Sequence, residues 1–173
     1  MLFTKHKVRF MSSRWRLLPL VAFLALGLVA VGANAASAAA LAVPFKASVS
    51  GTVTQTGLTT FALAGTGNDL IASHLGKISY AGSVTITGVD PNTGVITDTL
   101  TEMLTAANGD TLMLLCQQVA TPISPGVYHG VDQWTVVGGT GRFSGATGSG
   151  TGDTYVDLNA GTFTKQSTGT IRY

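Results

Sequence analysis

The chain has 173 residues, with 10 basic and 8 acidic side chains, a formal net charge of +2 and a single cysteine. One cysteine excludes an internal disulfide, and a chain of this length can bury one hydrophobic core. Only five basic residues lie outside the N-terminal segment, and they are scattered, which excludes the basic patch that a nucleic-acid partner needs.

The N-terminal segment has the three parts of a secretory signal. An apolar run, LLPLVAFLALGLVAVGA, extends from Leu17 to Ala33 and is followed by small residues. It is preceded by five basic residues and no acidic one: Lys5, Lys7, Arg9, Arg14 and Arg16. This pattern predicts a signal helix within residues 1–38, cleaved after Ala35 or Ala38. The mature protein is then secreted or periplasmic, and only this segment contacts a membrane.

The start site and the cleavage of this segment determine the mature chain. Translation from Met11 gives a more ordinary signal, which favours Met11 as the true start. An uncleaved anchor is the alternative, although 17 apolar residues are at the short edge of the ~20 that a membrane-spanning helix needs. Cleavage removes five of the 10 basic residues and none of the 8 acidic ones, so the mature chain carries 5 − 8 = −3 charges.

Residues 39–173 are predicted to form a single all-β domain. Apolar and polar residues alternate, and threonine, which suits the wet face of a strand, recurs on the polar side. Turn sequences such as DPNTG, ANGD and SPG separate the runs. The predicted strands are 44–54, 58–65, 76–88, 95–106, 111–120, 127–137, 146–158 and 161–172. Short links make neighbours antiparallel, so an eight-stranded antiparallel barrel is the expected fold, with a two-sheet sandwich as the alternative.

The most unusual stretch is VVGGTGRFSGATGSGTGD, from Val136 to Asp153. A dinucleotide-binding fingerprint needs a glycine where Ser144 stands and a helix directly afterwards. The following sequence is rich in glycine and then typical of a strand, so we expect a barrel corner that returns Phe143 to the core. No cofactor is predicted. The structural motif consists of Gly138, Gly139, Gly141, Phe143, Gly145 and Gly148.

This stretch resembles the GGTGxFxGAxG signature of the allene oxide cyclase and dirigent superfamily. The segment ASHLGK, residues 72–77, is similar to bacterial secreted proteins with a barrel of this type. The resemblance implies a calycin-like, eight-stranded antiparallel barrel. It also implies that a homo-oligomer is possible, because members of the family assemble as dimers or trimers.

Two carboxylates are the most informative candidate site residues. Asp98 and Glu102 share the phase of Ile96, Leu100 and Leu104, opposite a row of threonines. If that phase faces inward, both acids point into the barrel, about 13 Å apart along one strand. Buried acids need partners or shifted pKa values, which makes this pair a candidate for ligand binding or acid–base catalysis.

Other candidates are less specific. His74 precedes a strand and is either a catalytic group or a turn residue bonded to the backbone, the second being favoured. His129 shares a phase with Val127 and Val131 and faces the carboxylates if that phase is inward, or solvent if it is not. Tyr80 and Trp134 suit either a core or a pocket wall. The spacing of histidines and acids predicts no metal site, and Cys116 is expected to be buried.

The predicted function is that of an exported barrel, a binding or structural module that can hold a small apolar molecule. Tyr80, Glu102, His129 and Trp134 are the predicted ligand-binding residues. A missing nucleophile elbow favours binding over catalysis. The alternative is a cofactor-independent isomerase or cyclase resembling allene oxide cyclase, with Glu102, Asp98 or His74 as the acid–base group.

Overall fold

The computed structural model describes residues 41–65 and 69–173, and the predicted signal segment lies outside them. The described residues form nine strands and one short 3₁₀ helix. The strands are β1 (Val43–Gln55), β2 (Thr60–Gly65), β3 (Ile71–Ala72), β4 (Gly76–Val89), β5 (Ile96–Ala106), β6 (Thr111–Ser124), β7 (Val127–Gly139), β8 (Thr147–Asp157) and β9 (Thr162–Arg172). The 3₁₀ helix η1 spans Gly141–Phe143. No α-helix occurs among the described residues.

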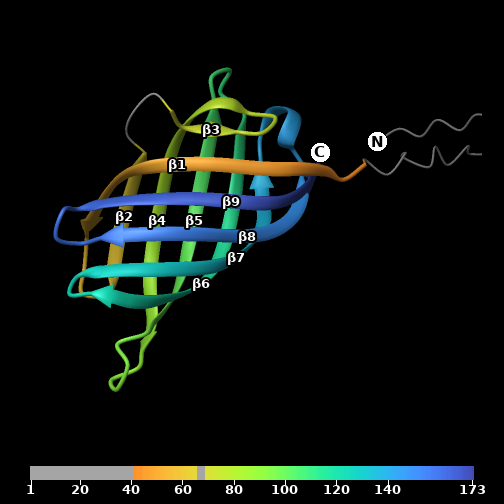
Figure 1. Cartoon of the computed structure of the whole chain (residues 1–173). Coiled ribbons are helices and arrows are strands. Elements are labelled where there is room, and N and C mark those ends of the chain that lie inside the picture. Colours follow the sequence, from red (N-terminus) through yellow and green to blue (C-terminus); the bar gives the residue numbers. More distant parts are fainter. Residues whose placement is uncertain (1–40, 66–68) are drawn as a thin grey trace, which may run out of the picture. The chain divides into compact units, whose positions relative to one another are not determined.

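The sheet closes on itself into an antiparallel barrel. Strands β4 to β9 pair in chain order, and β9 pairs with β1 over residues 43–52. Strands β2 and β3 both lie between β1 and β4, so nine strands occupy eight positions around the barrel. Figure 1 shows β1, β8 and β9 crossing in front of β4 and β5, as tilted strands of a closed barrel do. The predicted barrel and its eight long strands are confirmed, and β3 is the strand that the sequence pattern missed.

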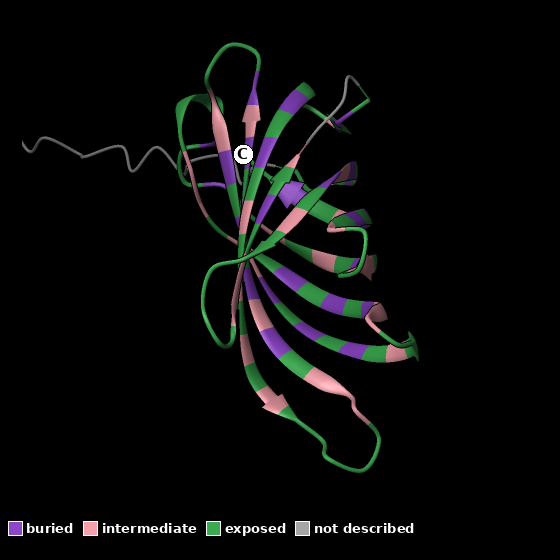
Figure 2. Ribbon diagram, turned by 90° about the vertical axis from the view of Figure 1, so that its left-hand side faces the viewer, coloured by how far each residue is buried: buried purple, intermediate pink, exposed green. Residues whose placement is uncertain are grey.

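Burial alternates along each strand, as Figure 2 shows by the alternating bands on the ribbons. Threonines of β5 and β9 lie on the outer face, as their alternation predicted. The inner face holds one apolar cluster, with Phe45, Leu100, Leu112, Trp134 and Ile171 among its most buried members. Inward-facing apolar side chains therefore supply the main stabilising contribution to the fold.

Two glycines make room for the largest buried side chain, Trp134. Gly150 and Gly169 are paired across β8 and β9, and a Cβ at either position would collide with the Trp134 ring. The ring packs edge-on against Phe45, with 5.3 Å between centroids, and its Nε1 donates to the Thr151 carbonyl at 3.1 Å. The glycine-rich sequence of β8 thus provides space in the barrel wall for an aromatic side chain on a neighbouring strand.

The glycine-rich stretch forms the predicted corner between β7 and β8. Phe143 is fully buried and its ring lies 4.9 Å from that of Tyr173. Gly141 has φ +58°, and the Asp110 carboxylate occupies the space that a side chain there would need. The main-chain N–H of Arg142 donates to that carboxylate at 3.4 Å. The motif is therefore a barrel corner that places Phe143 in the core.

The two ends of the barrel differ. We call the end that carries η1, the β3–β4 turn and the β5–β6 hairpin the closed end. The opposite end, where the β4–β5, β6–β7 and β8–β9 connections lie, is the mouth. Side chains such as Phe143 and Leu75 fill the closed end, whereas inner residues near the mouth such as Phe61 and Tyr128 are only partly buried.

Candidate functional site

A buried ion cluster crosses the middle of the barrel. The Lys165 Nζ of β9 lies 2.8 Å from Glu102 Oε1 of β5 and 2.9 Å from Asp132 Oδ2 of β7. All three side chains are at most 2% exposed. Removing charges from water is costly, so this arrangement requires the ammonium to lie between the two carboxylates. Lys165 alternates with outward-facing Thr164 and Gln166, which is why its side chain enters the barrel.

Tyr80 and Cys116 complete the surroundings of Glu102. The Tyr80 hydroxyl donates to Glu102 Oε1 at 2.7 Å, and the Cys116 thiol lies 3.4 Å from Oε2. Burial and then the charge of Glu102 raise the pKa of Tyr80 well above its usual value. The same two causes raise the pKa of Cys116, so its thiol is protonated and poorly nucleophilic. The expected burial of Cys116 is confirmed.

Lys165 is a fixed cation. Burial lowers the pKa of its ammonium, but the neighbouring acidic groups, with Glu102 first, outweigh that effect and raise the pKa above its usual value. A lysine acts as a general base or forms an imine only when it loses its proton near neutral pH. The chemistry available to Lys165 is therefore that of a permanent positive charge and hydrogen-bond donor.

Asp132 has fewer hydrogen-bond donors around its carboxylate than Glu102 has. Neither of its carboxylate oxygens meets a donor in hydrogen-bonding geometry among the described residues, although Oδ2 is close to the ammonium. Burial raises the pKa of Asp132, and the charge of Lys165 opposes that rise. The cluster thus contains more carboxylate than its single cation balances.

Asp98 lies closer to the mouth and has a different partner. The Gln118 amide, oriented with its nitrogen toward Asp98, donates to the two carboxylate oxygens at 3.2 and 3.1 Å. Burial raises the pKa of Asp98 to about 7, the charge of Asp132 adds to the rise, and Lys165 opposes it. Among the described residues, no cationic side chain forms an ion pair with Asp98. Asp98 can therefore change its protonation state near neutral pH.

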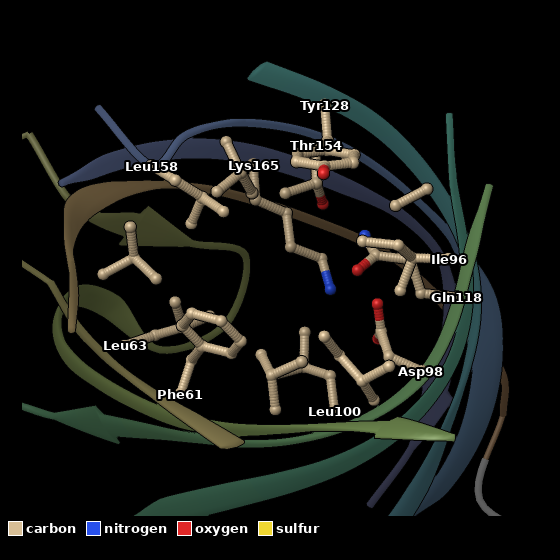
Figure 3. Close-up of a pocket in the computed structure, with 15 residues that line it drawn as sticks. Phe61, Leu63, Ile96, Asp98, Leu100, Gln118, Tyr128, Thr154, Leu158 and Lys165 are labelled. Atoms are coloured by element: carbon tan, nitrogen blue, oxygen red, sulfur yellow. The ribbon is translucent and has the colours of Figure 1, made fainter. Parts of the chain in front are cut away.

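A cavity of about 70 Å³ lies above this polar floor, inside the mouth. Its polar lining includes Asp98, Gln118, Thr154 and Lys165. Its apolar lining includes Val53, Phe61, Leu63, Val84, Leu100 and Val156. Figure 3 shows Phe61 and Leu63 on one side of the cavity and Asp98 and Gln118 on the opposite side. The Lys165 nitrogen points into the space between these two sides. The cavity is larger than one water molecule needs and smaller than a typical drug-binding pocket, so it fits a small molecule or one end of a longer one.

Thr154 adds an unused hydrogen-bonding group to this cavity. Its side chain is 2% exposed, and its hydroxyl has no hydrogen-bond partner among the described residues. Buried polar groups without partners are rare and destabilising. An unpartnered hydroxyl in the lining of a cavity is therefore a position where a ligand atom can bind.

The predicted inward position of Asp98 and Glu102 is confirmed, since both are buried in the barrel. Tyr80 and Trp134 are buried as well, Tyr80 in contact with Glu102 and Trp134 in the core cluster. Only Asp98 of these four lines the cavity at the mouth.

The two candidate histidines, His74 and His129, do not line the cavity. His129 lies on the outer face of β7, with Nε2 2.9 Å from Asp153 Oδ2 and its ring stacked on Tyr155. The prediction that His129 faces the barrel interior is wrong, because the alternate residues of β7, such as Asp132 and Trp134, face inward. His74 occupies a turn at the closed end with φ +67°, and its Nε2 lies 2.9 Å from the Pro44 carbonyl. The turn interpretation of His74 is confirmed.

Sequence reasoning missed Lys165, Asp132, Gln118 and Thr154. Lys165 could have been found, because the row of threonines in β9 was assigned to the outside and Lys165 stands on the other face. Asp132 lies on the same face of β7 as the buried Trp134 and could also have been found.

Within the part of the chain that the structure describes, no three acidic, histidine or cysteine side chains are grouped to hold a metal ion.

Comparison with known proteins finds no matching family model, no matching curated protein and no matching solved structure. A search of the described residues finds no helix long and apolar enough to cross a membrane. The fold and site themselves define a closed antiparallel β-barrel with a buried ion cluster and an apolar mouth.

Proposed function

We propose that this chain is an exported β-barrel protein that binds a small apolar molecule in its mouth. The observation that carries the proposal is the cavity, whose wall is largely apolar and whose floor offers the few polar groups that orient a ligand. The partly buried side chains around the mouth, such as Ile96 and Tyr128, provide further apolar surface for a molecule longer than the cavity.

Two sequence features support the cellular and evolutionary parts of this proposal. The basic, apolar and small-residue regions of residues 1–38 support export. The GGTGRF motif and the position of its corner before β8 support a calycin-like barrel related to the allene oxide cyclase and dirigent superfamily. A shared fold does not establish a shared activity, so the chemical nature of the ligand is inferred from the residues that line the cavity.

A cavity-filling substitution tests the binding site. Ala120 lines the cavity and is buried, whereas its neighbour Val119 is exposed on the outer face of β6. In isothermal titration with 1-hexanol, we expect Ala120→Leu to weaken binding at least about ten-fold, the equivalent of 1.4 kcal/mol. Val119→Leu is the matched control and should bind like the unmodified protein. Equal binding by both variants, or no binding of 1-hexanol to the unmodified protein, would contradict the proposal.

A second candidate function is isomerisation or cyclisation by acid–base catalysis. The observation that favours it is Asp98, a buried carboxyl in the cavity lining whose pKa is raised to about 7 by burial. Glu102 is held by Tyr80 and Lys165 and does not line the cavity, so Asp98 is the acid–base candidate. Exchange of the α-protons of 2-hexanone in D₂O, followed by NMR, tests this function. Catalysed exchange should disappear in Asp98→Asn, and exchange no faster than in buffer rejects it.

A further inference from the structure

We infer that the molecule bound in the mouth carries a cationic amine, which pairs with Asp98 while its apolar part contacts the opposite wall. This inference rests on the proposed binding function and adds the chemical class of the ligand. It follows from the charge balance inside the barrel, from the hydrogen-bonding groups of the cavity and from their placement.

The described interior contains three buried carboxylates and one buried cation. Asp98, Glu102 and Asp132 are each at most 5% exposed, and Lys165 is the only buried basic side chain among the described residues. The Lys165 ammonium is already committed to Glu102 and Asp132. Asp98 is left with a neutral amide partner, Gln118. A buried carboxylate without a cation is unfavourable, so a ligand that brings a positive charge binds where the protein lacks one.

The unpartnered Thr154 hydroxyl is a second, independent indication of a ligand. It lines the same cavity as Asp98, and Figure 3 shows both side chains at the polar part of the lining. An ammonium group has three N–H donors and needs several acceptors when it leaves water. The Asp98 carboxylate and the Thr154 hydroxyl supply two of them.

The same charges select against other head groups. A carboxylate would add a fourth negative charge beside Asp98, and Lys165 is already paired. An alcohol can use Thr154 and Asp98 as hydrogen-bond partners but gains no ion pair. The apolar body of each molecule would meet the same side chains, Phe61, Leu63 and Val84. The expected order of affinity is therefore amine, then alcohol, then carboxylate.

The preference for an amine should depend on pH, because Asp98 must be ionised to form the pair. The groups that surround Asp98 are Gln118 on β6, Asp132 on β7, Lys165 on β9 and the neutral residues Ile86 and Thr154 on β4 and β8. Burial raises the pKa of Asp98 to about 7, while an alkylamine stays protonated to about pH 10. Amine affinity should therefore increase between pH 6 and pH 8.

The test compares three probes of equal chain length: hexylamine, 1-hexanol and hexanoate, titrated calorimetrically into the purified protein at pH 8. Hexylamine should bind at least about ten-fold tighter than 1-hexanol, since charge-assisted hydrogen bonds contribute more than neutral ones. Hexanoate should bind weakest. At pH 6 the amine preference should shrink.

Asp98→Asn should remove the preference for hexylamine over 1-hexanol, because the site loses its negative charge while an oxygen acceptor remains. Asp153→Asn is the matched control, since Asp153 is on the outer face of β8 and 56% exposed. Thr154→Val is a second variant, expected to weaken amine binding more than 1-hexanol binding.

Three results overturn the inference in distinguishable ways. Equal affinity for amine and alcohol, or tightest binding of hexanoate, refutes the cationic head group and leaves the proposed binding function standing. Absence of binding by all three probes refutes both. An amine preference that persists in Asp98→Asn also refutes the assignment of Asp98.

Discussion

The closed end and the mouth of this barrel are made from the same strands but packed differently. At the closed end, Phe143 and Tyr173 lie against one another, and an Arg142 side-chain N–H donates to the His74 carbonyl across the end of the barrel. At the mouth, apolar side chains remain half-exposed and the interior below them is charged. The difference indicates that packing at one end stabilises the fold, which allows the other end to keep a cavity and costly buried charges.

The ion cluster lies between these two regions. Its cation comes from β9 and its carboxylates from β5 and β7, so it connects strands that are not neighbours in the sheet. A buried ion pair adds little net stability, because its attraction offsets the loss of hydration. We therefore expect the cluster to set the electrostatic character of the mouth more than the stability of the barrel.

The largest expected effect is at the closed end. Phe143→Ala should lower the free energy of unfolding by on the order of 4 kcal/mol, because a fully buried aromatic side chain is replaced by a cavity. Urea denaturation measures this change. Val137→Ala, on the outer face of β7, is the control and should cost less than about 1 kcal/mol. Similar losses in both variants would show that the closed end is not the stabilising region.

The next effect is in the ion cluster. Lys165→Met should cost on the order of 3 kcal/mol at pH 8, because it leaves Glu102 and Asp132 buried without a cation. Burial raises the pKa of Asp132, so protonation of that carboxylate should restore part of the stability at pH 5. Lys46→Met, which changes an exposed lysine of β1, should have little effect. The triple variant Lys165→Met, Glu102→Gln, Asp132→Asn should be more stable than Lys165→Met alone. If it is not, unpaired charge is not the cause of the loss.

The smallest effect is at the mouth and has the opposite sign. Burial raises the pKa of Asp98 from 3.8 to about 7, so the folded protein holds a proton that the unfolded chain loses between these pH values. The contribution of protonated Asp98 to the free energy of unfolding is fully present below pH 3.8 and is lost as the pH rises to about 7. Asp98→Asn should therefore be more stable than the unmodified protein at pH 8, by about 2 kcal/mol, since 1.36 kcal/mol per pKa unit sets an upper bound of about 4.

Denaturation at pH 5 and pH 8 measures this effect. The free energy of unfolding should fall less between pH 5 and pH 8 in Asp98→Asn than in the unmodified protein. Some decline should remain in the variant, because burial also raises the pKa of Asp132. Asp153→Asn should follow the unmodified protein. Parallel pH profiles for Asp98→Asn and the unmodified protein would mean that Asp98 is not the group that makes the mouth sensitive to pH.

The strands could be predicted closely, whereas the site could be predicted only in part. In β5 one face is threonine-rich and the other apolar, so the inward position of Asp98 and Glu102 followed from the alternation. In β7 both faces carry apolar residues, with Val131 outside and Trp134 inside. The pattern therefore could not decide which face His129 occupies, and the choice of His129 as a ligand-binding residue failed.

The sequence by itself determined the all-β class, the turns between the long strands and the corner at Phe143, because these depend on alternation and local turn chemistry. Tertiary structure alone decided that Lys165 meets Glu102 across 63 positions of the chain. It likewise decided that Asp98 meets the Gln118 amide and no cationic side chain among the described residues. It also decided which end of the barrel stays open. These features depend on register and closure, which combine strands that no local pattern relates.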